Sequence, residues 1–308
     1  MALAQLQKAK PGSKADIPRE ASIVVAAYNG MGTLKKTLDA LLAQKFSGKF
    51  EVIVVDDGST DRTAGFLESY AKGKKNLTAI IRKNSGVCAA RNAGIARARY
   101  GIVINMDHDC IAEKDWLSKM LAGFDSRDVA VVSAYDYYGG TSTAFRREPL
   151  LKVGGYDPQY RYYREDTDLS FKIMDLGYRF RLVQAGYLHD HVEAAPRGIL
   201  ATIKYGLKRL EYHQNDALLY KKHPTAVCGD FLHIKYGFLV DPVQDFRVAT
   251  GTWKADGKME LSSPRGITFL KNKGPLHAIA IILLGCGYVL AVKASRLIGS
   301  ARFGKLLI

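Results

Sequence analysis

The chain has few cysteines, and they are not clustered. Its four cysteines, Cys88, Cys110, Cys228 and Cys286, are scattered over 308 residues. The sequence has no Cys-x-x-Cys pair and no closely spaced set, which argues against a structural zinc site and against a disulfide framework. We therefore expect reduced thiols, as in a cytosolic compartment.

An apolar run of signal-peptide length is also missing from the first twenty residues. This segment is polar and contains Pro11, Gly12 and Pro18. It gives no indication of secretory export, and we expect residues 1–20 to form a polar extension.

Acidic residues are outnumbered by basic ones. The chain has 45 Lys and Arg against 30 Asp and Glu, a formal net charge of +15. This excess predicts attraction to polyanions, namely nucleotides, nucleic acid or an anionic membrane. With 47% hydrophobic residues, the chain is long enough for one large catalytic domain with a sizeable core and an appendage.

From residue 22, predicted strands and helices alternate. The expected strands are β-branched and apolar, and they cover residues 22–27, 50–55, 77–81, 101–106 and 129–133. Amphipathic helices are expected between them, at residues 34–42, after Ser59 or Thr60, at 85–99 and at 116–124. This alternation predicts an α/β fold with a mostly parallel sheet that is covered on both faces by right-handed crossovers.

The regular alternation of predicted strands and helices ends after Thr141. A helix is expected at residues 147–153, followed by a Gly-Gly break, a helix opened by Asp166 or Thr167, and a short strand at 180–183. We expect this part to form the acceptor side of an active site.

Clustered carboxylates follow two of the predicted strands. Residues 54–61 read VVDDGSTD, and residues 104–109 read INMDHD. An open α/β sheet presents ligand-binding groups at the carboxyl ends of its strands. Bunched carboxylates repel one another unless a cation or a donor-rich ligand lies between them. The pattern therefore predicts a divalent metal and a phosphate-bearing ligand at this edge.

Five segments occur in a fixed order: VVAAYN at 24–29, VVDDGSTD at 54–61, GVCAARNAG at 86–94, DHD at 107–109 and EDTDL at 165–169. In this order and spacing, residues 21–192 resemble the family 2 inverting glycosyltransferases of the GT-A fold. An Asp-x-Asp alone arises often by chance, whereas five segments in series are specific. The resemblance implies a Rossmann-like, mostly parallel sheet flanked by helices.

The resemblance also implies a nucleotide-sugar donor site. Tyr28, between Ala27 and Asn29, would stack on the base or line its pocket, and Asp57 would accept hydrogen bonds from base or ribose. Arg91 would lie close to the donor. The simpler interpretations are an ordinary strand-end aromatic for Tyr28 and a salt-bridged surface arginine for Arg91.

The same resemblance implies a metal site for Mn2+ or Mg2+. Asp107 and Asp109 point to one side of an extended segment, because strand side chains have period two, and they match the positions that hold the ribose and the metal. His108 between them points away. His189 or His191 would ligate the metal or contact the phosphates. A divalent cation stabilises the charge of the leaving nucleoside diphosphate.

Asp166 matches the catalytic carboxylate of the family, in a Glu-Asp pair with Glu165. An inverting transfer needs one base, within hydrogen-bond reach of the acceptor hydroxyl. We expect Glu165 and Asp168 to raise the proton affinity of Asp166 by adding negative charge. The simpler interpretation is that these carboxylates stabilise a helix N-terminus.

Two C-terminal segments indicate a membrane. Residues 198–222 form a basic, amphipathic pattern, typical of a helix on a membrane surface or of a helix packed with a solvated basic face. Residues 275–292 contain only one ionisable side chain, His277, and as a helix would cover roughly 27 Å, close to the ~30 Å of a bilayer core. They could cross the bilayer, lie in its interface, or form a buried core helix.

The basic tail that follows, with Lys293, Arg296, Arg302 and Lys305, is expected in the headgroup region. We therefore divide the chain into a catalytic domain at 21–195, a basic interface region at 196–274 and a membrane-associating segment at 275–308.

These patterns together predict a metal-dependent glycosyltransferase at the cytoplasmic side of the cell membrane. The expected reaction moves one sugar, mannose from GDP-mannose, to a lipid-linked glycan or a polyprenyl phosphate. Polymerisation is not expected, because the Gln-x-x-Arg-Trp motif of the processive polysaccharide synthases is missing.

Several alternatives remain. UDP-glucose or UDP-N-acetylglucosamine could replace GDP-mannose. A nucleotidyltransferase would need a basic, Gly-rich loop after the first strand, and residues 29–34 match it poorly. A non-enzymatic protein that binds nucleic acid or membranes would explain the charge, but no nucleic-acid-binding signature accompanies it, so no nucleic-acid partner is expected. An inactive scaffold of the same fold is the last alternative.

Overall fold

The computed structural model describes residues 16–135, 138–160, 162–190, 198–250 and 274–308. The chain divides into two compact units, with the boundary between residues 192 and 193. We call the part before this boundary the sheet unit and the part after it the helical unit. Three predicted features lie outside the described residues: His191, most of the polar extension, and residues 251–273 of the basic interface region.

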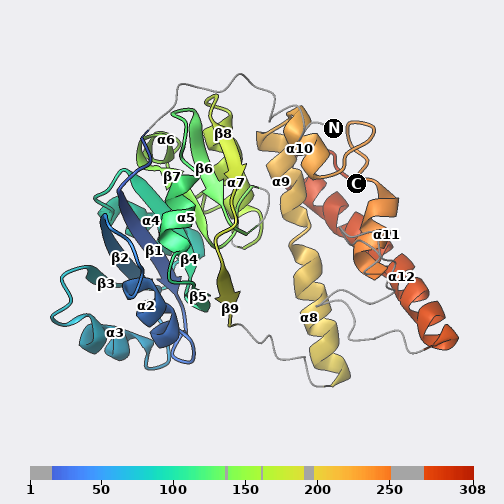
Figure 1. Cartoon of the computed structure of the whole chain (residues 1–308). Coiled ribbons are helices and arrows are strands. Elements are labelled where there is room, and N and C mark those ends of the chain that lie inside the picture. Colours follow the sequence, from blue (N-terminus) through green and yellow to red (C-terminus); the bar gives the residue numbers. More distant parts are fainter. Residues whose placement is uncertain (1–15, 136–137, 161, 191–197, 251–273) are drawn as a thin grey trace. The chain divides into compact units, whose positions relative to one another are not determined.

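The sheet unit is built on a seven-stranded sheet of order β3-β2-β1-β4-β7-β6-β8 (Figure 1). All neighbouring pairs are parallel except those that include β7, which runs antiparallel to β4 and β6. The strands are β1 (Glu20–Ala27), β2 (Lys49–Asp56), β3 (Leu77–Ile81), β4 (Ile102–Asp107), β6 (Val129–Ser133), β7 (Thr143–Arg146) and β8 (Arg179–Leu182). The five strands expected before Thr141 are present with ends shifted by at most two residues.

A second, two-stranded sheet lies beside the end of β4. It pairs β5 (Cys110–Ala112) antiparallel with β9 (Tyr187–His189), and Cys110 lies opposite His189. Neither strand was predicted, because three-residue strands carry too little alternation to be recognised.

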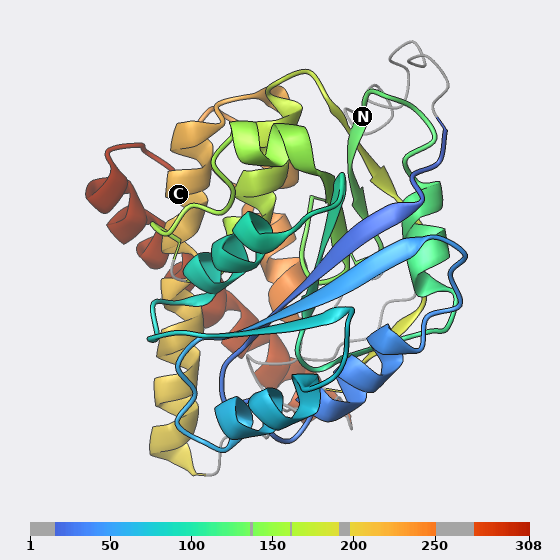
Figure 2. The same ribbon diagram turned by 90° about the vertical axis from the view of Figure 1, so that its left-hand side faces the viewer.

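Helices flank the main sheet. They are α2 (Leu34–Leu42), α3 (Thr63–Ala71), α4 (Val87–Arg97), α5 (Trp116–Ala122), α6 (Arg147–Lys152) and α7 (Glu165–Met174). Leu34, Leu38 and Leu41 of α2 are fully buried in the core, as their spacing predicts. A Cβ at Gly94 of α4 would lie 2.3 Å from Cγ1 of Val24, so glycine allows the close packing of α4 on β1. Figure 2 shows β1 and β2 side by side in the twisted sheet.

The helical unit contains α8 (Ile199–Glu211), α9 (Gln214–Lys222), α10 (Ala226–Phe231), α11 (Pro242–Thr250) and α12 (Pro275–Phe303). The single helix predicted over 198–222 is wrong, because it breaks between α8 and α9. At the break, the His213 ring lies 3.3 Å from Asp216 and 3.0 Å from the hydroxyl of Tyr288. A Cβ at Gly299 would lie 2.5 Å from the backbone oxygen of Gln214, so α9 and α12 cross closely there.

An ionic cluster holds α12 to α9 and α11. Arg296 is 4% exposed and bonds Asp216 at 3.1 Å and Asp245 at 2.7 and 3.2 Å. Lys293 donates to the backbone oxygens of Val240 and Ile308 at 2.5 and 3.2 Å. The prediction that these two cations lie among lipid headgroups is therefore wrong, since buried carboxylates and carbonyls of the protein hold them.

Within the described part of the chain, α12 is the one helix that is long and apolar enough to cross a membrane. Its 29 residues include an 18-residue window of mean hydropathy 2.1, of which 17% is buried. The helix nevertheless has one buried side and one exposed apolar side. Its buried residues include Ile281, Gly285, Val292 and Gly299, and the side chains exposed along it include Leu276, Ile279, Leu283, Leu290 and Leu297.

Candidate active site

The carboxyl ends of β1, β2 and β4 lie at one edge of the sheet. The register places Ala27 beside Asp56 and Ala26 beside Asp107. Asp56 is fully buried and accepts hydrogen bonds from the hydroxyl and backbone N–H of Ser59, so it shapes the loop after β2. The two carboxylate runs of the sequence therefore meet at this edge.

Asp57 fixes the turn that precedes α4. Its carboxylate accepts hydrogen bonds from the backbone N–H of Ser85, at 3.1 Å, and of Gly86, at 2.7 Å, and lies 3.6 Å from Nε of Arg82. The residue is 4% exposed. Three protein donors thus surround a carboxylate that has about four acceptor positions, so at most one position remains for a ligand.

The three residues at the end of β1 have different surroundings. Ala27 is buried in the core, whereas Tyr28 is 47% exposed. The side-chain oxygen of Asn29 accepts the N–H of Thr60 at 2.8 Å, and its own N–H donates to the hydroxyl of Ser59 at 2.8 Å. Asn29 therefore ties β1 to the loop after β2, and Tyr28 presents a ring to solvent.

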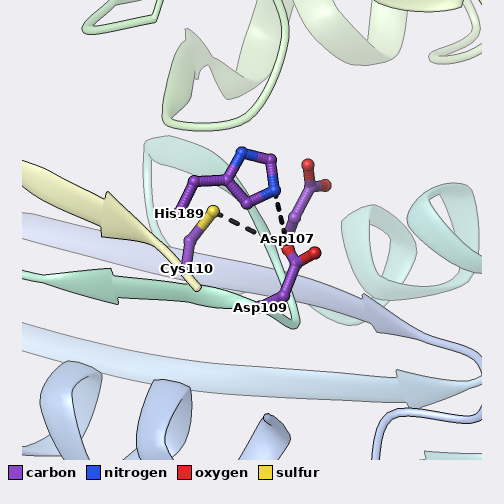
Figure 3. A group of neighbouring side chains, drawn as sticks. All are labelled: Asp107, Asp109, Cys110 and His189. Atoms are coloured by element: carbon purple, nitrogen blue, oxygen red, sulfur yellow. Dashed lines mark hydrogen bonds and ion pairs between the residues drawn. The ribbon is translucent and has the colours of Figure 1, made fainter. Parts of the chain in front are cut away.

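Asp107, Asp109, Cys110 and His189 form a cluster whose ligand atoms all lie within 4.8 Å of one another (Figure 3). Nε2 of His189 is 3.2 Å from Oδ1 of Asp109. Strand β4 ends at Asp107, and the β5–β9 pairing brings His189 opposite Cys110, which explains how residues eighty positions apart meet. His108 points elsewhere: a Cβ at Gly30 would lie 2.8 Å from its Cδ2.

The donor set of this cluster suits a hard divalent cation. Burial raises the pKa of the Cys110 thiol to about 12, and soft sulfur is not the ligand type that Mn2+ or Mg2+ prefers. Two carboxylates and an imidazole remain, an oxygen and nitrogen set that fits Mn2+ or Mg2+. The side chains of Asp107 and His189 are 32% and 44% exposed, so a ligand can reach them.

Arg91 connects this cluster with the start of α7. It is 4% exposed, and its guanidinium bonds Asp107 at 3.0 Å, Glu165 at 3.2 Å and Asp166 at 3.1 Å. It also lies over the ring of Tyr156, 5.1 Å from the centroid. Arg91 is thus neither a surface residue nor held by one partner: it is the buried counter-ion of three carboxylates.

Asp166 accepts hydrogen bonds on Oδ1 from Arg91 and, at 3.0 Å, from the hydroxyl of Tyr156. Burial raises the pKa of Asp166, Arg91 opposes this rise, and Asp107 adds to it. Burial also raises the pKa of Glu165, and its neighbour Asp166 adds to that rise. Oε2 of Glu165 has no hydrogen-bond partner among the described residues. The pair is therefore arranged to hold a proton more tightly than free carboxylates do.

Asp168 does not crowd Asp166 as predicted. It is fully buried and bonds Lys172 at 3.0 Å and the Tyr160 hydroxyl at 3.2 Å. Residues two positions apart on a helix face different sides, which directs Asp168 away from its neighbour. The negative charge that acts on Asp166 from outside the pair comes from Asp107.

Tyr156 is the site residue that the sequence did not reveal. Asn92 of α4 holds it by two hydrogen bonds of 2.8 Å, one from the Tyr156 N–H and one to its carbonyl. A Cβ at Gly155 would lie 2.5 Å from Oδ1 of Asn92. The Gly-Gly pair before Tyr156 predicted a turn in the sequence. It did not predict that the Tyr156 hydroxyl would bond Asp166.

Comparison with known proteins identifies a family that this chain matches. Residues 22–191, more than half of the chain, match the family described as Glycosyl transferase family 2. YfnE of Bacillus subtilis, an uncharacterized glycosyltransferase, is 32% identical over 146 residues, which are 46% of this chain and 37% of that protein. The chain covers half or less of the length of this and the next curated relatives.

Two solved structures are similar in fold. The mannosyltransferase PcManGT of Pyrobaculum calidifontis, in complex with GDP-Man and Mn2+, has a TM-score of 0.60 at 19% identity, over 96% of this chain and 92% of that one. TarS 1-349 of Staphylococcus aureus, in complex with UDP, has a TM-score of 0.52 at 19% identity, over 93% and 92% of the two chains. The predicted fold class is confirmed.

Proposed function

The chain belongs to glycosyl transferase family 2, and from this membership we propose that it transfers a single sugar, with inversion, from a nucleotide-sugar donor to an acceptor hydroxyl. The observation that carries the proposal is the buried ion-pair network in which Arg91 links the metal-type cluster at Asp107 to the carboxylate of Asp166. One continuous site thus contains groups for a diphosphate and a base for an acceptor.

Asp107, Asp109 and His189 would hold Mn2+ or Mg2+, and the bound cation would supply charge stabilisation for the leaving nucleoside diphosphate. Tyr28 offers its exposed ring to the base, and Asp57 its one remaining acceptor position to base or ribose. Ala27 and Asn29 would act by placing Tyr28 and the neighbouring loop.

Asp166 would act as the base. Both hydrogen bonds that it accepts are on Oδ1, so Oδ2 can receive the proton of the acceptor hydroxyl. As this proton moves to Oδ2, the hydroxyl oxygen forms its bond to the anomeric carbon, and the bond to the diphosphate oxygen breaks on the opposite face with its electron pair. Arg91 and Tyr156 hold Asp166 in place, and Glu165 acts through its own bond to Arg91.

For the donor we propose GDP-mannose. The support is the likeness in fold to PcManGT, whose structure contains GDP-Man and Mn2+. A UDP-sugar, UDP-glucose or UDP-N-acetylglucosamine, is the second candidate, favoured by the likeness to the UDP complex of TarS.

Thermal unfolding of the purified protein with GDP-mannose, UDP-glucose and UDP-N-acetylglucosamine, each with and without Mn2+, tests the donor site. A donor at ~100 times its dissociation constant should add about 2.7 kcal/mol of stability. We expect the gain to need Mn2+ and to be lost in Asp109→Ala. Asp175→Ala, which removes an exposed carboxylate at the end of α7, is the matched control and should keep it. If no donor raises the midpoint in the presence of metal, the proposed function is wrong.

For the acceptor we propose a lipid-linked glycan or polyprenyl phosphate at the cytoplasmic side of a membrane. The helical unit exposes large apolar side chains on α8 as well as α12, namely Leu200, Ile203 and Leu207. Lys204 and Lys208 lie exposed on the same helix, so the surface could contact both acyl chains and anionic headgroups. All four cysteines are free thiols, in line with a cytoplasmic location.

We further propose that α12 lies along the membrane surface and does not cross it. One side packs on α9 and α11 through Gly285, Val292 and Arg296, while the exposed apolar stripe continues on the other side from Leu276 to Leu297, roughly 31 Å. A spanning helix would have to take this packed side, with its ion pairs, into the bilayer, which is costly.

Cys286 is a natural probe of this arrangement, because it is exposed on α12 whereas the other three cysteines are buried. A fluorophore on Cys286, and on cysteines introduced at Leu276 and Leu297 in a Cys286→Ala background, would be quenched by nitroxide lipids labelled at known depths. We expect three similar, shallow depths in anionic vesicles. A label at Cys286 near the bilayer centre, with shallow labels at Leu276 and Leu297, would show that α12 crosses the bilayer.

A further inference from the structure

A cavity of about 620 Å3 opens in the sheet unit at the amino ends of the parallel strands. Its walls come from residues that precede β4, β6 and β8, from the last residue of β7 and from α6; they include Arg99, Tyr100, Arg127, Arg146, Arg147 and Tyr178. Strand β4 separates this end from Asp107 by roughly 17 Å. The cavity is thus distinct from the candidate active site.

The lining contains four arginines and a single acidic residue, Glu148. Arg99 is paired with Glu51 at 2.9 Å, outside the lining. Arg146 donates only to backbone oxygens, those of Val129 at 2.8 Å and of Ser126 at 3.0 Å. Among the described residues no carboxylate forms an ion pair with Arg146. Burial lowers its pKa and Arg127 adds to this fall, whereas Tyr178 and Asp128 oppose it.

Two further arginines, Arg127 and Arg147, line the cavity. Neither Arg127 nor Arg147 forms an ion pair with a described residue, and Nε of Arg147 is buried without a hydrogen-bond partner. Arg127 is exposed and can be solvated, whereas Arg146 and Arg147 are partly buried. The buried, unsatisfied Nε of Arg147 and the charge of Arg146 therefore lie in a concave site.

We propose that this cavity binds a phosphate-bearing anion, either a soluble phosphorylated metabolite or the phosphate of a lipid headgroup. Guanidinium groups match phosphate oxygens with paired, charge-assisted hydrogen bonds, and an anion would neutralise Arg127, Arg146 and Arg147 together. The volume is in the range of small-molecule sites, and the rings of Tyr100 and Tyr178 line its walls for the non-phosphate part of a ligand.

Calorimetric titration of the full chain in EDTA tests this proposal with two probes. Inorganic pyrophosphate represents a soluble phosphate, and dihexanoyl phosphatidic acid below its micellar concentration represents a headgroup without a membrane surface. The combined variant Arg127→Gln and Arg147→Gln should weaken binding at least tenfold. The matched control, Arg62→Gln with Arg97→Gln, removes two exposed arginines outside the cavity and should bind as the unmodified protein does.

Two further variants keep the result interpretable. Asp109→Ala should leave pyrophosphate binding unchanged, since the metal-type cluster takes no part. Arg127→Lys with Arg147→Lys retains the charge but not the paired geometry, and should bind with intermediate affinity if the variant has an unchanged unfolding midpoint. Tighter binding of the lipid probe would identify a headgroup, and tighter binding of pyrophosphate a soluble ligand. If neither probe binds, or if the double Gln variant binds like the control, the proposal is wrong.

Discussion

Asp166→Asn is expected to lower kcat by about 10^2- to 10^4-fold, the usual contribution of a general base, while leaving donor binding intact. The amide keeps the shape of the carboxylate, and its oxygen can still accept from Arg91 and Tyr156. Its NH2 group, however, cannot take the proton of an acceptor hydroxyl. Steady-state transfer rates, together with the Mn2+-dependent thermal shift by the donor, separate loss of chemistry from loss of binding.

Asp175→Asn is the matched control, because it makes the same change at an exposed position at the end of the same helix. Its kcat should stay within about twofold of the unmodified enzyme, as expected for a surface substitution. If Asp166→Asn has the same kcat as this control, Asp166 is not the base. Glu165, the other carboxylate whose pKa is raised, would then be the candidate.

The metal-type cluster shows how much of the site could be predicted. Asp107 follows directly from the sequence, because it ends β4 at the sheet edge. Asp109 lies near it for a different reason than predicted, since residues 108–109 form a turn and not the extended segment that a period of two requires. The place of His189 depends on β9 pairing with β5, two strands of three residues that have no readable pattern. Family resemblance suggested that histidine, and the pairing gives the physical reason for its position.

Arg91 and Tyr156 show more clearly which features of the site could not be predicted from the sequence. The sequence places Arg91 on a helix near the donor, but its three carboxylate partners come from β4 and α7, which only the tertiary fold brings together.

The ion pairs of the helical unit could not be predicted either. Lys293 and Arg296 look like the end of a membrane segment in sequence, and their partners Asp216 and Asp245 are more than forty residues away. Local patterns predict elements and strand ends well, and they do not predict such pairs.

Arg91→Gln is expected to destabilise the sheet unit by about 3–5 kcal/mol, the usual cost of removing one partner from a buried ion pair. Arg91 is 4% exposed, and its loss leaves the carboxylates of Asp107, Glu165 and Asp166 without their shared counter-ion. Urea unfolding, followed by tryptophan fluorescence of the buried Trp116, measures the change. Arg97→Gln, an exposed position on the same helix, should cost less than about 0.5 kcal/mol.

The dependence of this loss on pH follows from the sign of the pKa shifts. Without Arg91, burial and mutual repulsion raise the folded-state pKa of Glu165 and Asp166 further above their unfolded values, since Arg91 is the charged group that opposes the rise in both. Folding then favours the protonated forms, so stability is retained at low pH and lost as the pH rises through the raised pKa values. The deficit of Arg91→Gln should therefore be larger at pH 8 than at pH 5.

A second substitution identifies the cause of the deficit. Adding Asp166→Asn to Arg91→Gln removes one of the uncompensated charges, so the double variant should be more stable than Arg91→Gln alone at pH 8. If packing against Tyr156 were the main contribution of Arg91, the second change would bring no recovery and the deficit would not vary with pH. Recovery together with the pH dependence would show that Arg91 stabilises the site as a counter-ion, which is also how it would hold Asp166 ready to accept a proton.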